Sequence, residues 1–179
     1  MPLCRNISST IGPLLLTVAH GAITSLTMGS LVPDAPPHHP AFPHDPADVH
    51  TADKAQSQLA EYFSGVRTIF DLPLAPQGTP FRQSVWAALQ PIPYGQTRSY
   101  LDIAKAVDPT RATNLSRAIG QANGANPIGI IIPCHRVIAA SGKLSGYAGG
   151  VAAKQWLLEH EQRPAQARKT QLLTLFCGL

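Results

Sequence analysis

Cysteines and long apolar runs are both scarce in this chain of 179 residues. Its three cysteines, Cys4, Cys134 and Cys177, are widely spaced and form no CxxC pair, which argues against a disulfide framework and favours a reducing compartment. No apolar stretch reaches the roughly 18 residues of a membrane-spanning helix, and the basic and apolar regions of a secretory signal are lacking. We therefore expect a cytoplasmic protein with no membrane partner.

Metal-ligand patterns are lacking as well. His38, His39 and His44 lie near one another, but among prolines and without cysteines or the regular spacing of a metal site. Residues 33–46 hold six prolines, which favours an extended, solvated loop. We expect no metal ion and no cofactor.

Charged residues make up only 13% of the chain and are unevenly distributed. Residues 1–79 hold three Lys and Arg against six Asp and Glu, whereas residues 80–179 hold eleven against four. A basic half is typical of a protein that binds a polyanion, nucleic acid first. Modest positive charge can also serve solubility alone, so both interpretations stay open.

The first part of the chain predicts a small β-rich unit with one helix. Two β-prone runs within residues 14–26 flank a His-Gly pair at 20–21, a pattern typical of a hairpin. A helix is expected over residues 52–64, with Gly65 as its stop.

The second part predicts mainly helices. A polar break at residues 77–78 divides the chain into domains over residues 1–78 and 79–179. Helices are expected in the second domain from Pro80 to about Gln90, over Ser99–Val107, from Thr113 or Asn114 to about Asn123, and over Val151–Glu161. The tight connection between two of these short helices suggests a helix-turn-helix. The expected fold class is α+β.

A reactive cysteine is suggested by the run Pro133-Cys134-His135-Arg136-Val137. The apolar residues 128–132 before it indicate a fully buried strand, which would place a thiol at the end of a rigid element. The histidine beside it is a proton acceptor, and the arginine after that is a cation that could stabilise a thiolate. The alternative is that Cys134 is simply a small buried hydrophobe.

The predicted helix over residues 114–123 is rich in small residues. Gly120 and Gly124 lower helix stability, and the usual reason to tolerate that is close approach of another backbone. One interpretation is tight packing against a second helix. The other is approach to a narrow groove of DNA, with Arg117 reaching in; the residues alone leave both open.

Five motifs resemble those of one known family, the O6-alkylguanine-DNA alkyltransferases, or methylated-DNA–protein-cysteine methyltransferases. They fall in order at compatible spacings, and the match spans roughly residues 70–161. The motifs are the Asn126-Pro127 pair, the PCHRV run, the helix with Arg117, the loop Gly146-Tyr147-Ala148-Gly149-Gly150 and the segment from Trp156 to Glu161. The resemblance implies a variable β-rich domain, then a DNA-binding domain with a helix-turn-helix and a winged-helix-like active-site region.

The resemblance also implies a mechanism. Cys134 would be the nucleophile, His135 would take its proton through a water, and Glu161 would orient the histidine. Because a free thiol is only a few per cent ionised at neutral pH, we expect the pKa of Cys134 to be lowered. Without the resemblance, Glu161 would be interpreted as a solvated residue at a helix end. The resemblance implies that Arg136 braces the turn that carries Cys134.

The remaining site residues follow from the same resemblance. Tyr100 would donate a proton to the leaving guanine, and Asn126 would be the hinge that braces the cysteine turn. The substrate pocket would be formed by Pro133, Val137, Tyr147, Ala148 and Gly149. Contacts to the minor groove of DNA would come from Arg117, Ala118, Gly120 and Gln121, with Arg117 filling the place of a flipped nucleotide.

The implied partner is double-stranded DNA that contains O6-alkylguanine, with O4-alkylthymine as a second lesion. We expect the protein to bind it as a monomer and, in a bacterium, to be associated with the nucleoid. The product would be a stable thioether, so each molecule would react once. Residues 108–116 are about three residues longer than is usual for the family. Two other functions stay open: a Cys-His-Glu hydrolase, and a non-enzymatic sensor of alkylated DNA, although the cysteine is replaced in the known non-catalytic relatives.

Overall fold

The computed structural model describes residues 1–29, 45–144 and 146–163. Most of the proline-rich stretch, the histidines at 38, 39 and 44, and the tail with Cys177 lie outside the described residues. Within the described part, no helix is long and apolar enough to cross a membrane. Residues 1–29, 45–144 and 146–163 form a small sheet and five α-helices, which confirms the α+β fold class.

The N-terminal layer is an antiparallel sheet in the order β1-β2-β3. Its strands are β1 (Leu3–Ile7), β2 (Leu14–Ala19) and β3 (Ala22–Met28). The predicted hairpin is confirmed, because β2 and β3 pair across His20 and Gly21, whose φ angles are 54° and 74°. Two residues with positive φ form the tight turn that matches the twist of paired strands.

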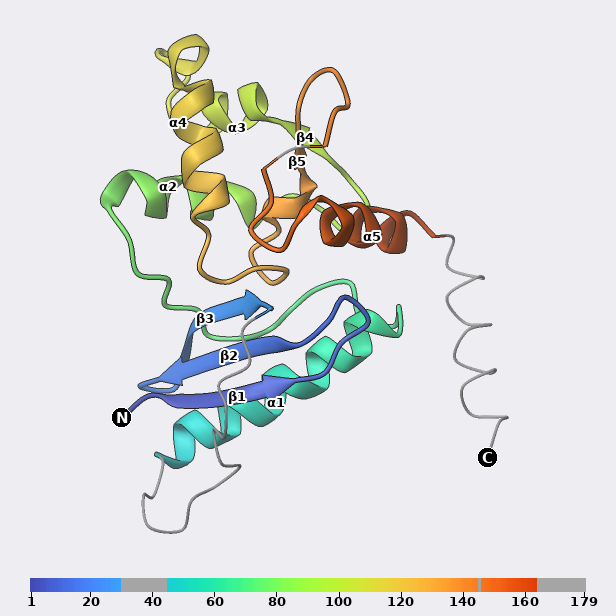
Figure 1. Cartoon of the computed structure of the whole chain (residues 1–179). Coiled ribbons are helices and arrows are strands. Elements are labelled where there is room, and N and C mark those ends of the chain that lie inside the picture. The colour runs from blue at the N-terminus through green and yellow to red at the C-terminus, as the bar shows by residue number, and fades with distance from the viewer. Residues whose placement is uncertain (30–44, 145, 164–179) are drawn as a thin grey trace.

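The helix α1 (Pro46–Phe63) packs against this sheet (Figure 1). It begins six residues before the predicted start at residue 52. The Asp45 side chain accepts a hydrogen bond from the Ala47 N–H at 2.9 Å, and a proline at the first helical position has no N–H to leave unpaired. The helix ends as predicted before Gly65, which has φ 77°.

The C-terminal layer holds the predicted helices, α2 (Pro80–Leu89), α3 (Tyr100–Val107), α4 (Ala112–Gly124) and α5 (Val151–Gln162). Thr79 caps α2, and Ser99 and Asp102 form a capping box on α3. Helices α3 and α4 pack together across a four-residue connection and form the helix-turn-helix. The two-residue strands β4 (Arg98–Ser99) and β5 (Val137–Ile138) pair in parallel beside it.

The predicted strand over residues 128–132 is wrong, although its burial is confirmed. Only Ile128 bridges to another strand, at Leu26, and the chain then turns with Ile130 at φ 70°. A 3₁₀ turn, η1 (Cys134–Arg136), follows directly. An apolar run reports burial, but it cannot by itself separate a strand from a compact buried turn.

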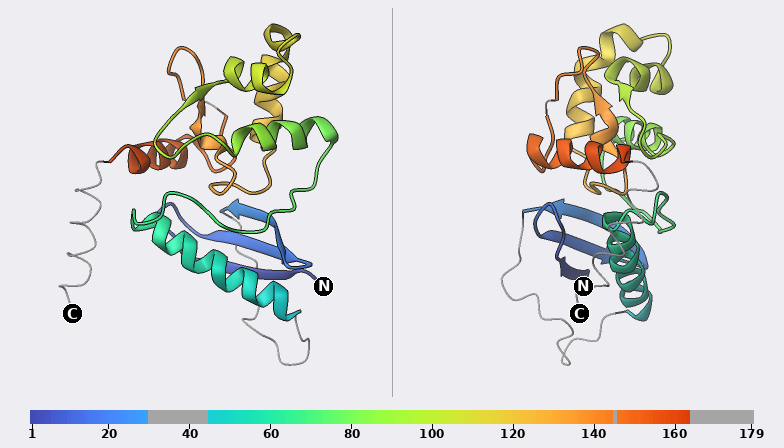
Figure 2. Two further views of the ribbon diagram at one scale, coloured as in Figure 1. Left: turned by 180° about the vertical axis from the view of Figure 1, so that it is seen from behind. Right: turned by 90° about the vertical axis from the view of Figure 1, so that its right-hand side faces the viewer.

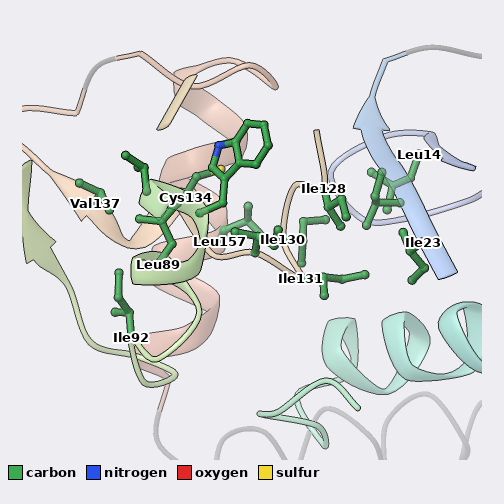
Figure 3. Close-up of a cluster of buried hydrophobic side chains, with 14 of the residues drawn as sticks. Leu14, Ile23, Leu89, Ile92, Ile128, Ile130, Ile131, Cys134, Val137 and Leu157 are labelled. Atoms are coloured by element: carbon green, nitrogen blue, oxygen red, sulfur yellow. The ribbon is translucent and has the colours of Figure 1, made fainter. Parts of the chain in front are cut away.

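This buried turn joins the two layers of the molecule. Figure 2 shows the sheet and α1 together as one layer and the other helices as a second layer. The segment after α4 lies between the two layers. In Figure 3, Ile128 lies toward Leu14 and Ile23 of the sheet, while Ile130 lies near Leu157. All of these side chains are at most 1% exposed, so the residues just before Cys134 are fixed by packing from both layers.

Candidate active site

Cys134 is the first residue of η1 and is a free thiol that is only 5% exposed. It borders a cavity of about 70 Å³ that is also lined by Asn123, Tyr147 and Gly149. Its backbone N–H donates to Ile132 O at 2.8 Å, which closes the turn behind it. The thiol therefore lies at the edge of a small cavity, on a turn that a backbone hydrogen bond closes.

Asn126 holds the turn that carries this cysteine. Its side-chain Nδ2 donates to Ile132 O at 2.9 Å and to Ile128 O at 3.3 Å, and its Oδ1 accepts from the Ile128 N–H at 3.1 Å. One amide thus ties the start of the apolar run to its end. These bonds satisfy backbone groups that a strand ladder would otherwise have to pair.

Glu161 is buried at the centre of a hydrogen-bond network, so its interpretation as a solvated residue at a helix end is wrong. Its Oε1 lies 2.8 Å from His135 Nε2 and accepts from the Tyr62 hydroxyl at 2.7 Å. Its Oε2 accepts from the backbone N–H of Gly95 at 3.0 Å. Arg136 donates to both oxygens, at 2.8 and 2.9 Å. A buried carboxylate that is saturated in this way has a fixed orientation.

The charges in this network decide the protonation of its members. Burial acts to raise the pKa of Glu161, but hydrogen bonds and charges from His135 and Arg136 outweigh it and hold that pKa well below its usual range. Burial also lowers the pKa of His135, against the opposing effect of Glu161. At neutral pH the glutamate is therefore ionised and the imidazole is neutral.

The lowered pKa expected for Cys134 is not found. Burial raises the pKa of its thiol, although a hydrogen bond from Asn126 and the charge of Lys154 act in the opposite direction. Arg136 donates hydrogen bonds to Glu161 and, at 2.6 Å, to Ile92 O. It therefore braces the turn and does not act as the cation beside the thiol. The resting cysteine is protonated, and its proton must be removed during the reaction.

Three side chains that form hydrogen bonds in this site were missed from the sequence. Tyr62 comes from α1 in the other layer, Asn123 donates from α4 to Cys134 O at 3.3 Å, and Lys154 donates to Val137 O at 2.6 Å. Lys154 carries the one visible signal, because it lies three residues before the buried Leu157 and seven before Glu161, on the inner face of α5. Nothing in the sequence around Tyr62 or Asn123 separates them from ordinary helix residues.

The predicted pocket residues divide into two groups. Tyr147, Ala148 and Gly149 line the cavity beside Cys134. Pro133 and Val137 are buried but are not among its lining residues, and neither is Tyr100, which is half-buried at the start of α3. The cavity also has a wall that was not predicted, the end of strand β3 from Leu26 to Met28.

The four predicted DNA-contact residues lie on α4, where Arg117 and Gln121 are exposed and Ala118 and Gly120 are half-buried. A Cβ on Gly124 would meet no atom within 4 Å, and one on Gly120 would only approach the Tyr100 ring at 3.9 Å. Packing inside the protein therefore does not require glycine at either position. This favours the second interpretation of the small-residue helix, an outward face open to a partner.

Comparison with known proteins agrees with this geometry. Residues 80–163 match the family model described as the DNA-binding domain of 6-O-methylguanine DNA methyltransferase. A methylated-DNA–protein-cysteine methyltransferase of Mycobacterium tuberculosis is 47% identical over 172 residues, which cover 96% of this chain and 97% of the relative. One of Methanosarcina acetivorans is 55% identical over 108 residues, 60% of this chain and 67% of the relative.

Solved structures give the same result across both layers. The crystal structure of the M. tuberculosis O6-methylguanine methyltransferase aligns with a TM-score of 0.75 at 46% identity, covering 98% of this chain and 99% of the other. The M. tuberculosis OGT in complex with DNA aligns with a TM-score of 0.73 at 46% identity, covering 92% of this chain and 97% of that one. The chain therefore belongs to the methylated-DNA–protein-cysteine methyltransferases, enzymes that repair DNA directly by moving an alkyl group to a protein cysteine.

Proposed function

We propose that this protein transfers the alkyl group from O6 of guanine, and also from O4 of thymine, in double-stranded DNA to Sγ of Cys134. The observation that carries the proposal is the geometry around that thiol. Cys134 borders a cavity, its neighbour His135 is bonded to the ionised Glu161, and the turn that holds both is fixed by Asn126. These are the parts that an activated cysteine nucleophile needs.

The proton of the thiol would pass to His135. Because His135 Nε2 lies 2.8 Å from the Glu161 carboxylate, it carries the ring hydrogen, which leaves Nδ1 as a lone-pair acceptor. Nδ1 is buried and has no hydrogen-bond partner among the described residues. A water between Nδ1 and Sγ would relay the proton. The imidazolium that forms would be stabilised by the adjacent carboxylate.

The alkyl transfer is a single displacement. The thiolate attacks the alkyl carbon, the S–C bond forms as the C–O6 bond breaks, and the electron pair stays on the guanine. Tyr100 is proposed to stabilise that charge by donating a proton to the ring. The product thioether has no good leaving group, so each molecule reacts once.

Base access would depend on α4. The target atom lies inside a stacked duplex, and the nucleotide must therefore leave the stack to reach Cys134. Arg117 is exposed on α4, and we propose that it fills the vacated place while Ala118, Gly120 and Gln121 contact the minor groove. A monomer suffices, because all of the proposed groups lie on one chain. Binding would depend on phosphates and groove shape more than on sequence.

Intact-protein mass spectrometry tests the proposal. After incubation with duplex DNA that contains O6-methylguanine, we expect a gain of one methyl group on Cys134 and no further turnover. Cys134→Ala should abolish the gain, whereas Cys4→Ala, at the other described cysteine, should leave it unchanged. DNA binding with no mass gain would support a sensor instead, and release of methyl product over many turnovers would support a hydrolase.

A further inference from the structure

We infer that Met28, the last residue of strand β3, forms the wall that sets how large an alkyl group the Cys134 site accepts. This inference rests on the proposed function. It assigns substrate selection to the N-terminal sheet, which the sequence motifs of the family do not include.

Strand β3 is fastened to the turn that carries the cysteine. The Leu26 N–H donates to Pro127 O at 2.8 Å, and the Gly129 N–H donates to Leu26 O at 2.9 Å. Since side chains two residues apart on a strand lie on the same face, Met28 is directed to the same side as Leu26. Both residues line the cavity beside Cys134.

Met28 fills the space between the cysteine turn and the glycine-rich loop. A Cβ placed on Gly149 would collide with Met28 Sδ and lie 2.8 Å from its Cε. A Cβ on Gly129 would lie 3.7 Å from the same Cε. Gly149 has no positive φ, so its backbone would accept alanine. A side chain there would have to displace the end of the Met28 side chain and would lie 3.1 Å from the Tyr147 ring.

The cavity is too small for the substrate as it stands. Its volume is about 70 Å³, whereas sites for small molecules usually measure about 300–1,000 Å³. The backbone on the cysteine side is held by Asn126 and by the bonds to Leu26. Met28 is the unbranched wall residue with three rotatable side-chain bonds, and methionine adapts its shape readily. The room for the alkyl group therefore depends on where this thioether can move.

Rate constants for two lesions test the inference. Transfer to Cys134 is measured by intact mass from duplexes that contain O6-methylguanine or O6-benzylguanine. Met28→Ala should raise the benzyl-to-methyl rate ratio about tenfold or more, the usual effect of small changes in an apolar pocket. Met28→Phe should lower the ratio. Because this variant keeps the space filled, it still tests the inference if Met28→Ala reduces the stability of the fold. Met28→Leu, which conserves volume, should leave the ratio within about threefold.

A double mutant supplies an independent readout. Gly149→Ala should slow transfer from both lesions, and adding Met28→Ala should restore much of the lost rate, because the colliding atoms are then removed. Independent, multiplying effects of the two substitutions would overturn the inference, as would an unchanged ratio in Met28→Ala and Met28→Phe. If the wild-type protein accepts neither group, the proposed function itself fails. Normal methyl transfer with an unchanged benzyl-to-methyl rate ratio would exclude only the role of Met28.

Discussion

At the scale of single residues, the site is organised by one carboxylate. Glu161 accepts hydrogen bonds from Tyr62, Arg136 and Gly95 and is bonded to His135. The carboxylate orients the imidazole, and Arg136 neutralises its charge without reaching the thiol. A buried ion pair of this kind contributes specificity of geometry more surely than it contributes stability. Removing one partner, in contrast, leaves a buried charge uncompensated.

Glu161→Gln tests this role. It should lower the free energy of unfolding at pH 7 by about 3–5 kcal/mol, because Arg136 loses its buried partner, and it should slow methyl transfer. Urea denaturation and the mass assay measure the two effects. Glu159→Gln, an exposed position on the same helix, is the matched control and should change neither. Wild-type transfer rates in Glu161→Gln would remove the glutamate from the mechanism.

The same residue predicts how stability depends on pH. The pKa of Glu161 in the folded protein lies below its ordinary value of 4.5, so its contribution is fully present above that value and is lost as the pH falls toward the folded pKa. Wild-type protein should therefore lose stability more steeply below about pH 4.5 than Glu161→Gln does. Parallel curves for the two proteins would contradict the depressed pKa.

At the scale of elements, α4 joins the surface that we propose contacts DNA to the site around Cys134. Its exposed face carries Arg117 and Gln121, while Asn123 at its far end donates to the backbone carbonyl of Cys134. Trp86 of α2 holds the helix from behind by donating to Ala122 O at 2.8 Å. If α4 shifts when the protein binds DNA, the hydrogen bond from Asn123 would transmit that shift to the backbone of Cys134.

Arg117→Ala should separate DNA handling from chemistry. Since a flipped nucleotide needs a replacement in the stack only when the substrate is a duplex, repair of duplex DNA should slow by about tenfold or more, the cost of roughly 1.4 kcal/mol. Reaction with free O6-benzylguanine should be unchanged, as judged by protein mass. Arg82→Ala, exposed on α2, is the charge-matched control. Equal losses with both substrates would exclude the flipping role.

At the scale of the whole molecule, the two layers share one core and one active site. The buried turn before Cys134 packs between the two layers (Figure 3). The hydroxyl of Tyr62 in α1 donates a hydrogen bond to Glu161 in α5. Met28 adds a wall from the sheet. The boundary after residue 78 stays a prediction, and the contacts across it indicate that the parts on either side do not act separately.

Tyr62→Phe tests this coupling. It removes one hydroxyl from the Glu161 network and should lower the free energy of unfolding by about 1–3 kcal/mol. Tryptophan fluorescence reports on Trp86 and Trp156 in the helical layer, and circular dichroism reports on the whole fold. Both probes should show a single, coincident transition in wild type and variant. Separate transitions would show that the layers unfold independently.

The sequence by itself determined the features that depend on neighbours along the chain. The hairpin follows from a His-Gly pair between β-prone runs, and α2 follows from Thr79 and Pro80, because turns and caps are made by residues a few positions apart. The adjacent Cys134 and His135 likewise suggested a reactive cysteine, and the resemblance to the family supplied the role of Asn126 and the alkyl transfer.

Only the tertiary structure decided what depends on contacts between distant residues. It turned the predicted strand over 128–132 into a compact turn packed from both sides, and it raised the pKa of Cys134 by burial rather than lowering it. It also brought Tyr62 and Met28 to the site from the other layer. These features depend on which distant segments pack against and pair with one another, and the spacing of residues along the chain does not specify that.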